Sequence, residues 1–278
     1  MYKIIKKDNG IVEFDISKII LALTSALEKE DSSFFNEQKA EVERENYRKY
    51  VRVMAELDWP AFLERSPRFH REIISCVEAA DMEGITTSLY THFGNRFLSE
   101  LELRLRQSAV IHPKRLPALL EAILLYQRKH YYGAVAVLIP QIEGILSDIG
   151  THLSDLGYAY DEKTLDLLAT RYHVPSTSKS EKAAAIKAAL EANDVDGVAN
   201  EYGYLIGYLR TIVLKGELSE DGLAENPNRH AICHGRQSNY GTKTHALKVI
   251  LCIDALEHIS SVLAKQSALS ATEHPDVF

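Results

Sequence analysis

Apolar residues recur three and four positions apart through most of this chain, and that spacing constrains its fold more than any other feature. In an α-helix, residues at this spacing share one face, and each such face needs a partner surface to cover it. A charged, helix-favouring stretch over 36–57 stops at Trp59-Pro60, and His112-Pro113 interrupts the helical pattern a second time. The pattern therefore predicts an all-α protein whose helices pack together in a bundle.

The helical signals divide the chain into a series of predicted helices. They cover residues 16–27, 36–57, 70–80, 82–107, 115–128, 131–153, 195–215 and 242–265. The helices 115–128 and 131–153 are typical of an antiparallel pair joined by a short turn. Pro140 falls inside the second of them and predicts a kink there.

The first residues follow a different pattern, because apolar and polar residues alternate there. The alternation surrounds Asp8-Asn9-Gly10, and Asn-Gly suits the positive φ angles of a tight hairpin turn. We therefore expect a small N-terminal β-hairpin, followed by additional N-terminal helices. A loose boundary at residue 112 divides the chain into this N-terminal region, 1–112, and a C-terminal helical domain, 113–278. A capping-box pattern predicts a surface helix inserted near residues 178–193.

Composition excludes several classes of protein. Hydrophobic residues make up 46% and charged residues 26% of the 278 positions, as in folded globular proteins. Three cysteines without C-x-x-C spacing argue against a disulfide framework or a cysteine-rich zinc module. No secretory signal and no run of roughly 18 apolar residues is evident, so we expect a cytoplasmic protein with no membrane partner. The net charge of −7 weakens any case for broad, sequence-independent DNA binding.

One segment near the C-terminus carries its own helix signals. Asn226 is a suitable N-cap, and Pro227 suits the first position of a helix. Gly235 is a suitable C-terminal stop. The segment therefore predicts a compact helix between the last two long helices.

That compact helix contains three side chains suited to chemistry on a phosphodiester. His230 and His234, four positions apart, share a face, whereas Arg229 lies roughly 140° around the axis from His234. Histidine titrates near neutral pH, and the planar guanidinium binds phosphate oxygens at two points. The plain alternative for an arginine and a histidine at this spacing is a pair of solvated surface side chains.

A zinc site is a second alternative for the same segment. His230, Cys233 and His234 are residue types that bind zinc. Cys233 points about 60° away from His230 on a helix, and no fourth ligand is evident. We therefore expect neither a metal nor another cofactor.

The segment also resembles a known motif. Arg229 and His234, with the polar His230 directly after the arginine, resemble the R-x4–6-H motif of the HEPN superfamily of helical ribonucleases. The resemblance covers roughly residues 113–265 and implies a HEPN-like helical bundle. Its flanking features are similar to those of a bacterial group of HEPN-like proteins: Asn228, His234-Gly235, Tyr240-Gly241-Thr242, Tyr131-Tyr132 and Pro140-Gln141-Ile142-Glu143-Gly144.

This resemblance implies a function and a partner. It implies a metal-independent endoribonuclease in which His234 is acid or base, Arg229 holds the scissile phosphate and His230 supports either role. The family's motif pairs across a dimer interface, which implies a homodimer that acts on RNA. The implied setting is a bacterial toxin or phage-defence system, with an antitoxin or defence protein as a further partner. The alternative is a non-catalytic HEPN-like module that binds RNA or protein.

Four further residues are candidates for support or substrate binding. Glu143 is a candidate to orient Arg229 or a histidine, and an ordinary surface carboxylate is the alternative. Asn228 precedes the arginine directly. Tyr240 and His245 flank the motif and are candidates to touch RNA.

The first residues carry a second, shorter resemblance. The stretch from Lys3 to Ile19 resembles the opening of the ATP-cone, a nucleotide-binding regulatory domain. The match covers fewer than 30 residues and does not continue beyond Glu28. A basic hairpin packed on the helical body is therefore the expectation, and control by a nucleotide is the alternative.

Overall fold

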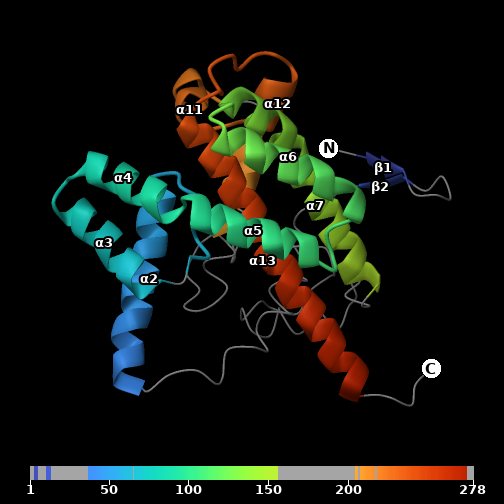
Figure 1. Ribbon diagram of the computed structural model, residues 1–278, viewed down its shortest axis with the longest axis horizontal. Helices are drawn as coiled ribbons and strands as arrows, with labels where there is room; N and C mark the ends of the chain where they lie inside the picture. Colours follow the sequence, from blue (N-terminus) through green and yellow to red (C-terminus); the bar gives the residue numbers. More distant parts are fainter. Residues whose placement is uncertain are drawn as a thin grey trace, which may run out of the picture.

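The computed structural model shows a protein built mainly of helices (Figure 1). The structure describes residues 3–5, 11–13, 37–64, 66–155, 204–205, 207–216 and 218–273. The all-α class is confirmed for the described residues from 37 onward. In chain order its elements are β1 (Lys3–Ile5), β2 (Ile11–Glu13), α2 (Glu37–Glu56), α3 (Pro67–Glu78), α4 (Met82–His92), α5 (Asn95–Gln107), the 3-10 helix η1 (Pro113–Arg115), α6 (Leu116–Gln127), α7 (Tyr131–Asp155), the π-helical turn η2 (Leu209–Val213), α11 (Glu220–Glu225), α12 (Arg229–Cys233) and α13 (Lys243–Glu273).

Several predicted elements fall partly or wholly outside the described residues. β1 and β2 pair antiparallel, with Ile4 opposite Val12. The Asn-Gly turn between them is not described, so the hairpin turn stays a prediction. The helix expected over 16–27, the inserted helix near 178–193 and the first part of the helix expected over 195–215 also lie outside the described residues.

One predicted helix is wrong, because residues 82–107 form two helices. α4 ends at His92, and α5 begins at Asn95 after the extended Gly94. Phe93, between them, is 2% exposed and packs its ring 5.6 Å from Phe69 and 4.9 Å from Phe97. The turn at this point lets α5 take a new direction, while Phe93 stays buried between Phe69 and Phe97. The apolar spacing continues across the break and therefore does not reveal it.

The centre of the bundle is α13. Every residue from 245 to 253 is buried, as expected for a helix covered on all sides. α6 and α7 pack against each other and against α13. A short turn at Lys129, which adopts a φ of 63°, joins α6 to α7. Figure 1 shows α13 running from the end of the bundle near α11 and α12 to the opposite end.

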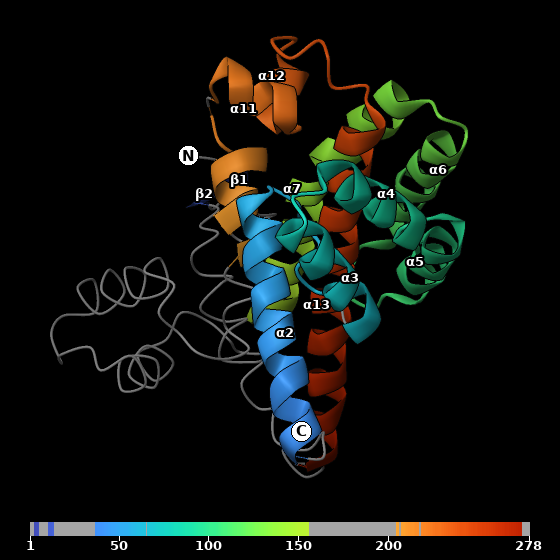
Figure 2. The same cartoon turned by 90° about the vertical axis from the view of Figure 1, so that its left-hand side faces the viewer.

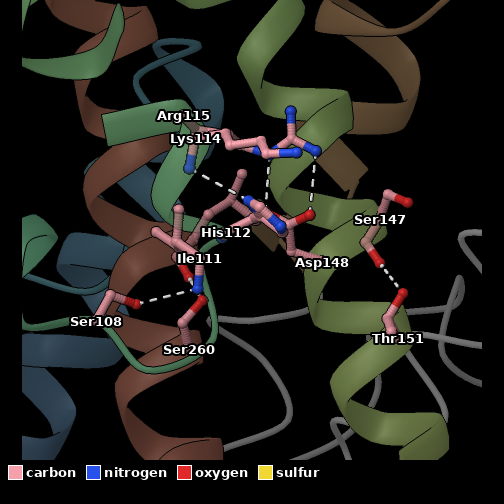
Figure 3. A network of polar contacts seen from close by, with 10 residues as sticks. Ser108, Ile111, His112, Lys114, Arg115, Ser147, Asp148, Thr151 and Ser260 are labelled. Atoms are coloured by element: carbon pink, nitrogen blue, oxygen red, sulfur yellow. Dashed lines mark hydrogen bonds and ion pairs between the residues drawn. The ribbon is translucent and has the colours of Figure 1, made fainter. Parts of the chain in front are cut away.

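The buried residues form one continuous core. The cluster extends from Tyr50 in α2 to Leu263 in α13 and includes Ile111, next to the boundary expected at residue 112. That junction is tied to α7, because Asp148 accepts hydrogen bonds from the His112 backbone N–H (2.8 Å) and from the Arg115 guanidinium (2.7 and 3.0 Å) (Figure 3). The division into 1–112 and 113–278 therefore stays a prediction.

α7 is long and apolar for a structural reason. Among the described helices, only its stretch Tyr131–His152 is long and apolar enough to cross a membrane. Val135, Leu138 and Ile142 of this stretch are buried in the core. The helix continues through Pro140 to Asp155. Its composition is that of a helix packed between α6 and α13.

Candidate functional site

The motif helix is shorter than predicted and begins two residues later. α12 covers only Arg229–Cys233, and its N-cap is Asn228, whose side-chain oxygen accepts a hydrogen bond from the Ala231 N–H (2.8 Å). Asn226, the predicted N-cap, instead follows α11 with an extended backbone. Pro227 is buried just before the helix rather than at its first position. Either asparagine suits a cap, and tertiary contacts decide between them.

The end of α12 agrees with the prediction. Gly235 has a φ of 70°, a left-handed conformation that glycine adopts at little cost. His234 is the C-cap residue, and its backbone N–H donates to the His230 carbonyl (3.1 Å). His234 therefore lies just beyond the last turn of α12. α11 and α12 lie together at the end of the bundle where α13 begins (Figures 1 and 2).

The three motif side chains are all accessible. His234 is exposed, and Arg229 and His230 are half-buried. The rings of His230 and His234 lie with their centroids 4.4 Å apart, which confirms that they share a face. Arg229 instead reaches α7, where its Nη2 lies 2.7 Å from Glu143 Oε2. Both side chains of this ion pair are 23% exposed, so Glu143 orients the guanidinium without burying it.

Asn228 has a structural role beneath the motif. Its side chain is completely buried, and its Nδ2 donates to the carbonyl oxygens of Ile212 (2.7 Å) and Lys215 (3.0 Å). Its backbone N–H donates to the side-chain oxygen of Gln237 (3.0 Å). Asn228 therefore links the start of α12 to η2 and the residues that follow it, and it fixes the position of the motif helix from the buried side.

We expect Asn228→Ala to destabilise the protein by about 2 to 4 kcal/mol. The substitution removes the helix cap and leaves buried backbone carbonyl groups without their donor. Urea denaturation followed by circular dichroism measures the loss. Asn239→Ala, in the exposed loop after α12, is the matched control and should change the free energy of unfolding by less than about 0.5 kcal/mol. Equal stability of the two variants would contradict the capping role.

Gln237 was not anticipated from the sequence. It is 2% exposed, and its Nε2 donates to the carbonyl oxygens of Leu223 (2.6 Å) and Asn226 (2.9 Å). Together with its bond from Asn228, these contacts hold the two ends of the motif segment close to each other. The polar composition of this loop was the only sequence signal for these buried hydrogen bonds. Such a composition more often indicates an exposed loop.

A buried lysine joins the motif segment to the N-terminal helices. Lys248 is 2% exposed, and its Nζ donates to Asn226 Oδ1 (2.9 Å) and to the Glu225 carbonyl (3.0 Å). Asn226 Nδ2 in turn donates to Asp58 Oδ2 (3.0 Å), directly after α2. The Lys248 Nζ also lies 5.2 Å from the centre of the Trp59 ring. These bonds occupy the Asn226 side chain, which is why Asn228 caps α12.

The environment of Lys248 predicts a pH-dependent stability. Burial lowers the pKa of Lys248 from 10.5 to about 8, although the nearby charge of Asp58 opposes the shift. Between about pH 8 and 10.5 the unfolded chain holds this proton more tightly than the folded chain. The contribution of Lys248 to the free energy of unfolding therefore rises with pH between about pH 8 and 10.5, and it is constant below pH 8.

We expect the free energy of unfolding of the wild type, relative to Lys248→Met, to rise by a few kcal/mol between pH 8 and 10.5. The variant has no titratable group at this position, so the difference between the two proteins isolates the contribution of Lys248. Urea denaturation at pH 7.5, 9 and 10.5 provides the measurement. Parallel pH profiles for the two proteins would show that Lys248 keeps its ordinary pKa.

The two flanking residues differ in their surroundings. His245 was expected as a candidate to touch RNA, but it is 2% exposed, and its Nε2 donates to the Ala224 carbonyl (3.1 Å). Burial lowers its pKa, as does the nearby charge of Lys248. His245 therefore packs the start of α13 against α11, because its face of α13 points into the core. Tyr240 lies near the surface, with its ring 5.0 Å from that of Tyr132.

The zinc alternative gains no support. Within the part of the chain that the structure describes, no three histidine, cysteine, aspartate or glutamate side chains are placed to hold a metal ion. His230 and His234 come together, but Cys233 does not complete a site with them. Cys233 is an exposed free thiol.

The stretch from α12 into the first half of α13 carries basic side chains and no acidic ones, although the whole chain is acidic. The chain has a net charge of −7, yet residues 226–253 contain no aspartate or glutamate. Four basic residues lie in this stretch, namely Arg229, Arg236, Lys243 and Lys248. Arg236 is exposed, and its Nη2 donates to the Gly216 carbonyl (3.0 Å). Arg229 is paired with Glu143 and Lys248 is buried near Asp58, so Arg236 and Lys243 contribute the accessible positive charge of this stretch.

Compared with protein families, with curated proteins and with solved structures, the chain shows no match.

Proposed function

We propose that this chain is a metal-independent endoribonuclease of the HEPN type. The observation that carries the proposal is that His230 and His234 lie side by side at the end of α12, while Arg229 at its start pairs with Glu143, and all three side chains are at least partly exposed. The absence of acidic residues from 226–253 adds support, because the substrate is a polyanion. The fold adds support, because α6, α7 and α13 pack against one another and α12 packs against α7, an arrangement compatible with a HEPN-like bundle.

The reaction assigns a role to each side chain. In metal-free RNA cleavage the 2′-hydroxyl attacks the adjacent phosphorus and the bond to the 5′-oxygen breaks. A base removes the hydroxyl proton, an acid protonates the leaving oxygen, and a cation stabilises the charge that develops on the phosphate. His234 is the acid or base, and Arg229 holds the phosphate. His230, with its ring next to that of His234, supports either proton transfer.

The active form in this proposal is a symmetric homodimer. Arg229 turns toward α7, while His234 lies at the opposite end of α12, five positions later. Pairing two α12 helices around a two-fold axis places the arginine of one copy near the histidine of the other. A partner's phosphate-binding arginine then completes a site that one chain holds only in part. Light scattering should report a dimer at micromolar concentration.

The cellular setting is part of the same proposal. A ribonuclease with this motif suits a cytoplasmic toxin or phage-defence effector, held in check by an antitoxin or a defence partner protein. A non-catalytic RNA- or protein-binding module is the alternative, since the ion pair with Glu143 neutralises Arg229 in the single chain.

The test is cleavage of end-labelled single-stranded RNA by the purified protein in the presence of EDTA. We expect products with a 2′,3′-cyclic phosphate end, and we expect DNA of the same sequence to stay intact because it lacks the 2′-hydroxyl. RNA binding without cleavage would favour the non-catalytic module. Cleavage that EDTA abolishes and zinc restores would instead support metal binding by His230, Cys233 and His234.

A further inference from the structure

An exposed tyrosine lies beside the loop that follows the motif. Tyr132, in the first turn of α7, is 55% exposed. The other large hydrophobic side chains exposed to this degree in the described part of the chain are all aliphatic. Its hydroxyl donates to the Ser238 carbonyl (3.1 Å), and its ring packs 5.0 Å from Tyr240 at an angle of 75°.

Gly241 completes the support of this ring. A Cβ atom at position 241 would come within 2.1 Å of the Tyr132 ring, so only glycine allows the ring to rest on the loop backbone. The tyrosine is thus held on several sides while more than half of it remains exposed. Ordering such a side chain in advance lowers the entropy lost when a ligand binds to it.

The tyrosine and the motif lie along one face of α7. Tyr132 and Glu143 are eleven residues apart, about three helical turns or 16 Å, and therefore point in nearly the same direction. Ala136 and Pro140, which lie between them on this face, are exposed and small. Tyr132, Ala136 and Pro140 therefore form an exposed strip of α7 beside the buried Ile139, and the strip ends three residues before Glu143, which holds Arg229.

The chemistry of this strip suits a single-stranded nucleic acid. Bases of a single strand stack on aromatic rings, while basic side chains contact the backbone. The adjoining loop supplies the exposed Arg236, and the first residue of α13 is Lys243, whose Nζ lies 3.7 Å over the Tyr90 ring. A chain with a net charge of −7 gains little from general attraction to phosphates. A stacked base is therefore an effective way for this site to hold its substrate.

We infer that Tyr132 and Tyr240 form a base-stacking subsite that holds an unpaired nucleobase of the RNA a few nucleotides from the phosphate bound by Arg229. This inference rests on the proposed ribonuclease function. The subsite sets where the strand lies relative to the cleaved bond, and it takes no part in proton transfer.

The first test compares Tyr132→Ala with Tyr132→Phe in cleavage of a short single-stranded RNA. We expect Tyr132→Ala to raise KM by about 5- to 100-fold, the usual contribution of one stacked base, with kcat within about threefold of the wild type. Tyr132→Phe keeps the ring and should stay within about threefold in both constants. Leu103→Ala, at an equally exposed apolar side chain on α5, is the matched control and should change neither.

The second test removes the base rather than the tyrosine. A series of RNAs with one abasic residue at successive positions should contain one position that raises KM as much as Tyr132→Ala does. In Tyr132→Ala itself, that abasic RNA should show no further loss, because the two changes remove the same contact. If Tyr132→Ala fails to fold, as judged by circular dichroism, the abasic series with the wild type carries the test alone.

The outcomes separate the subsite from the proposed function. If the wild type cleaves RNA but neither Tyr132→Ala nor any abasic position changes KM, the subsite is wrong and the ribonuclease stands. If RNA binds without being cut, fluorescence anisotropy of the same variants tests the subsite through Kd. If the wild type neither binds nor cleaves RNA, the ribonuclease and the subsite are both wrong.

Discussion

His234→Ala is expected to slow cleavage of single-stranded RNA by about 10² to 10⁴-fold, because it removes a positioned group that transfers a proton. His234 is exposed at the end of α12, with the ring of His230 next to it. The substitution therefore changes the reaction without opening a cavity in the core. Single-turnover rates on labelled RNA, with saturating enzyme and EDTA present, measure the effect.

The matched control for this prediction is His152→Ala. His152 also lies near the surface, but it is on α7 more than two turns beyond Glu143. We expect its cleavage rate to stay within about threefold of the wild type. Cleavage that persists unchanged in His234→Ala would show that the activity belongs to another site or to a contaminant.

Arg229→Ala is expected to slow cleavage by about 10² to 10³-fold, the usual loss when a group that stabilises the transition-state charge is removed. Arg229→Lys should restore little of this rate, since an ammonium group cannot make the two-point contact of a guanidinium with phosphate. Glu143 fixes the position of the guanidinium, which lies 2.7 Å from its carboxylate. The same single-turnover assay applies, and melting temperatures of the variants show whether the loss is specific to catalysis.

Two controls refine the arginine prediction. Arg236→Ala removes an exposed arginine of the same segment and should lower the rate by less than about tenfold, because its guanidinium contacts the Gly216 carbonyl instead of the motif. Mixing Arg229→Ala with His234→Ala should recover part of the activity, since a mixed dimer still holds one arginine and one histidine. A mixture as slow as its two components would contradict a site shared between copies.

The buried contacts around the motif give the N-terminal helices a role in the site. Lys248 and Asn226 link α13 and the motif segment to Asp58, in the turn that follows α2. Tyr90 of α4 also shares a hydrogen bond with the Thr244 hydroxyl (2.7 Å) in the first turn of α13. The helices before residue 112 therefore support the segment that carries Arg229 and His234.

The amino-acid sequence by itself determined the features that depend on local geometry. The three- and four-residue spacing of apolar side chains predicted α6 and α7 closely, and helix-favouring composition with a Trp-Pro stop predicted α2. The sequence also placed His230 and His234 on one face and ended the motif helix at Gly235. These features depend on helix geometry and on the backbone preferences of single residues. A short stretch of sequence is therefore enough to predict them.

Only the tertiary structure decided which of several locally equivalent residues takes which place. Asn226 and Asn228 are equally good caps, and the bonds of Asn226 to Lys248 and Asp58 leave Asn228 to begin α12. The burial of His245 and the pairing of Arg229 with Glu143 likewise follow from helix packing. These contacts join residues up to 168 positions apart. The free energy of burying and pairing a polar group depends on such distant partners, and no local pattern encodes them.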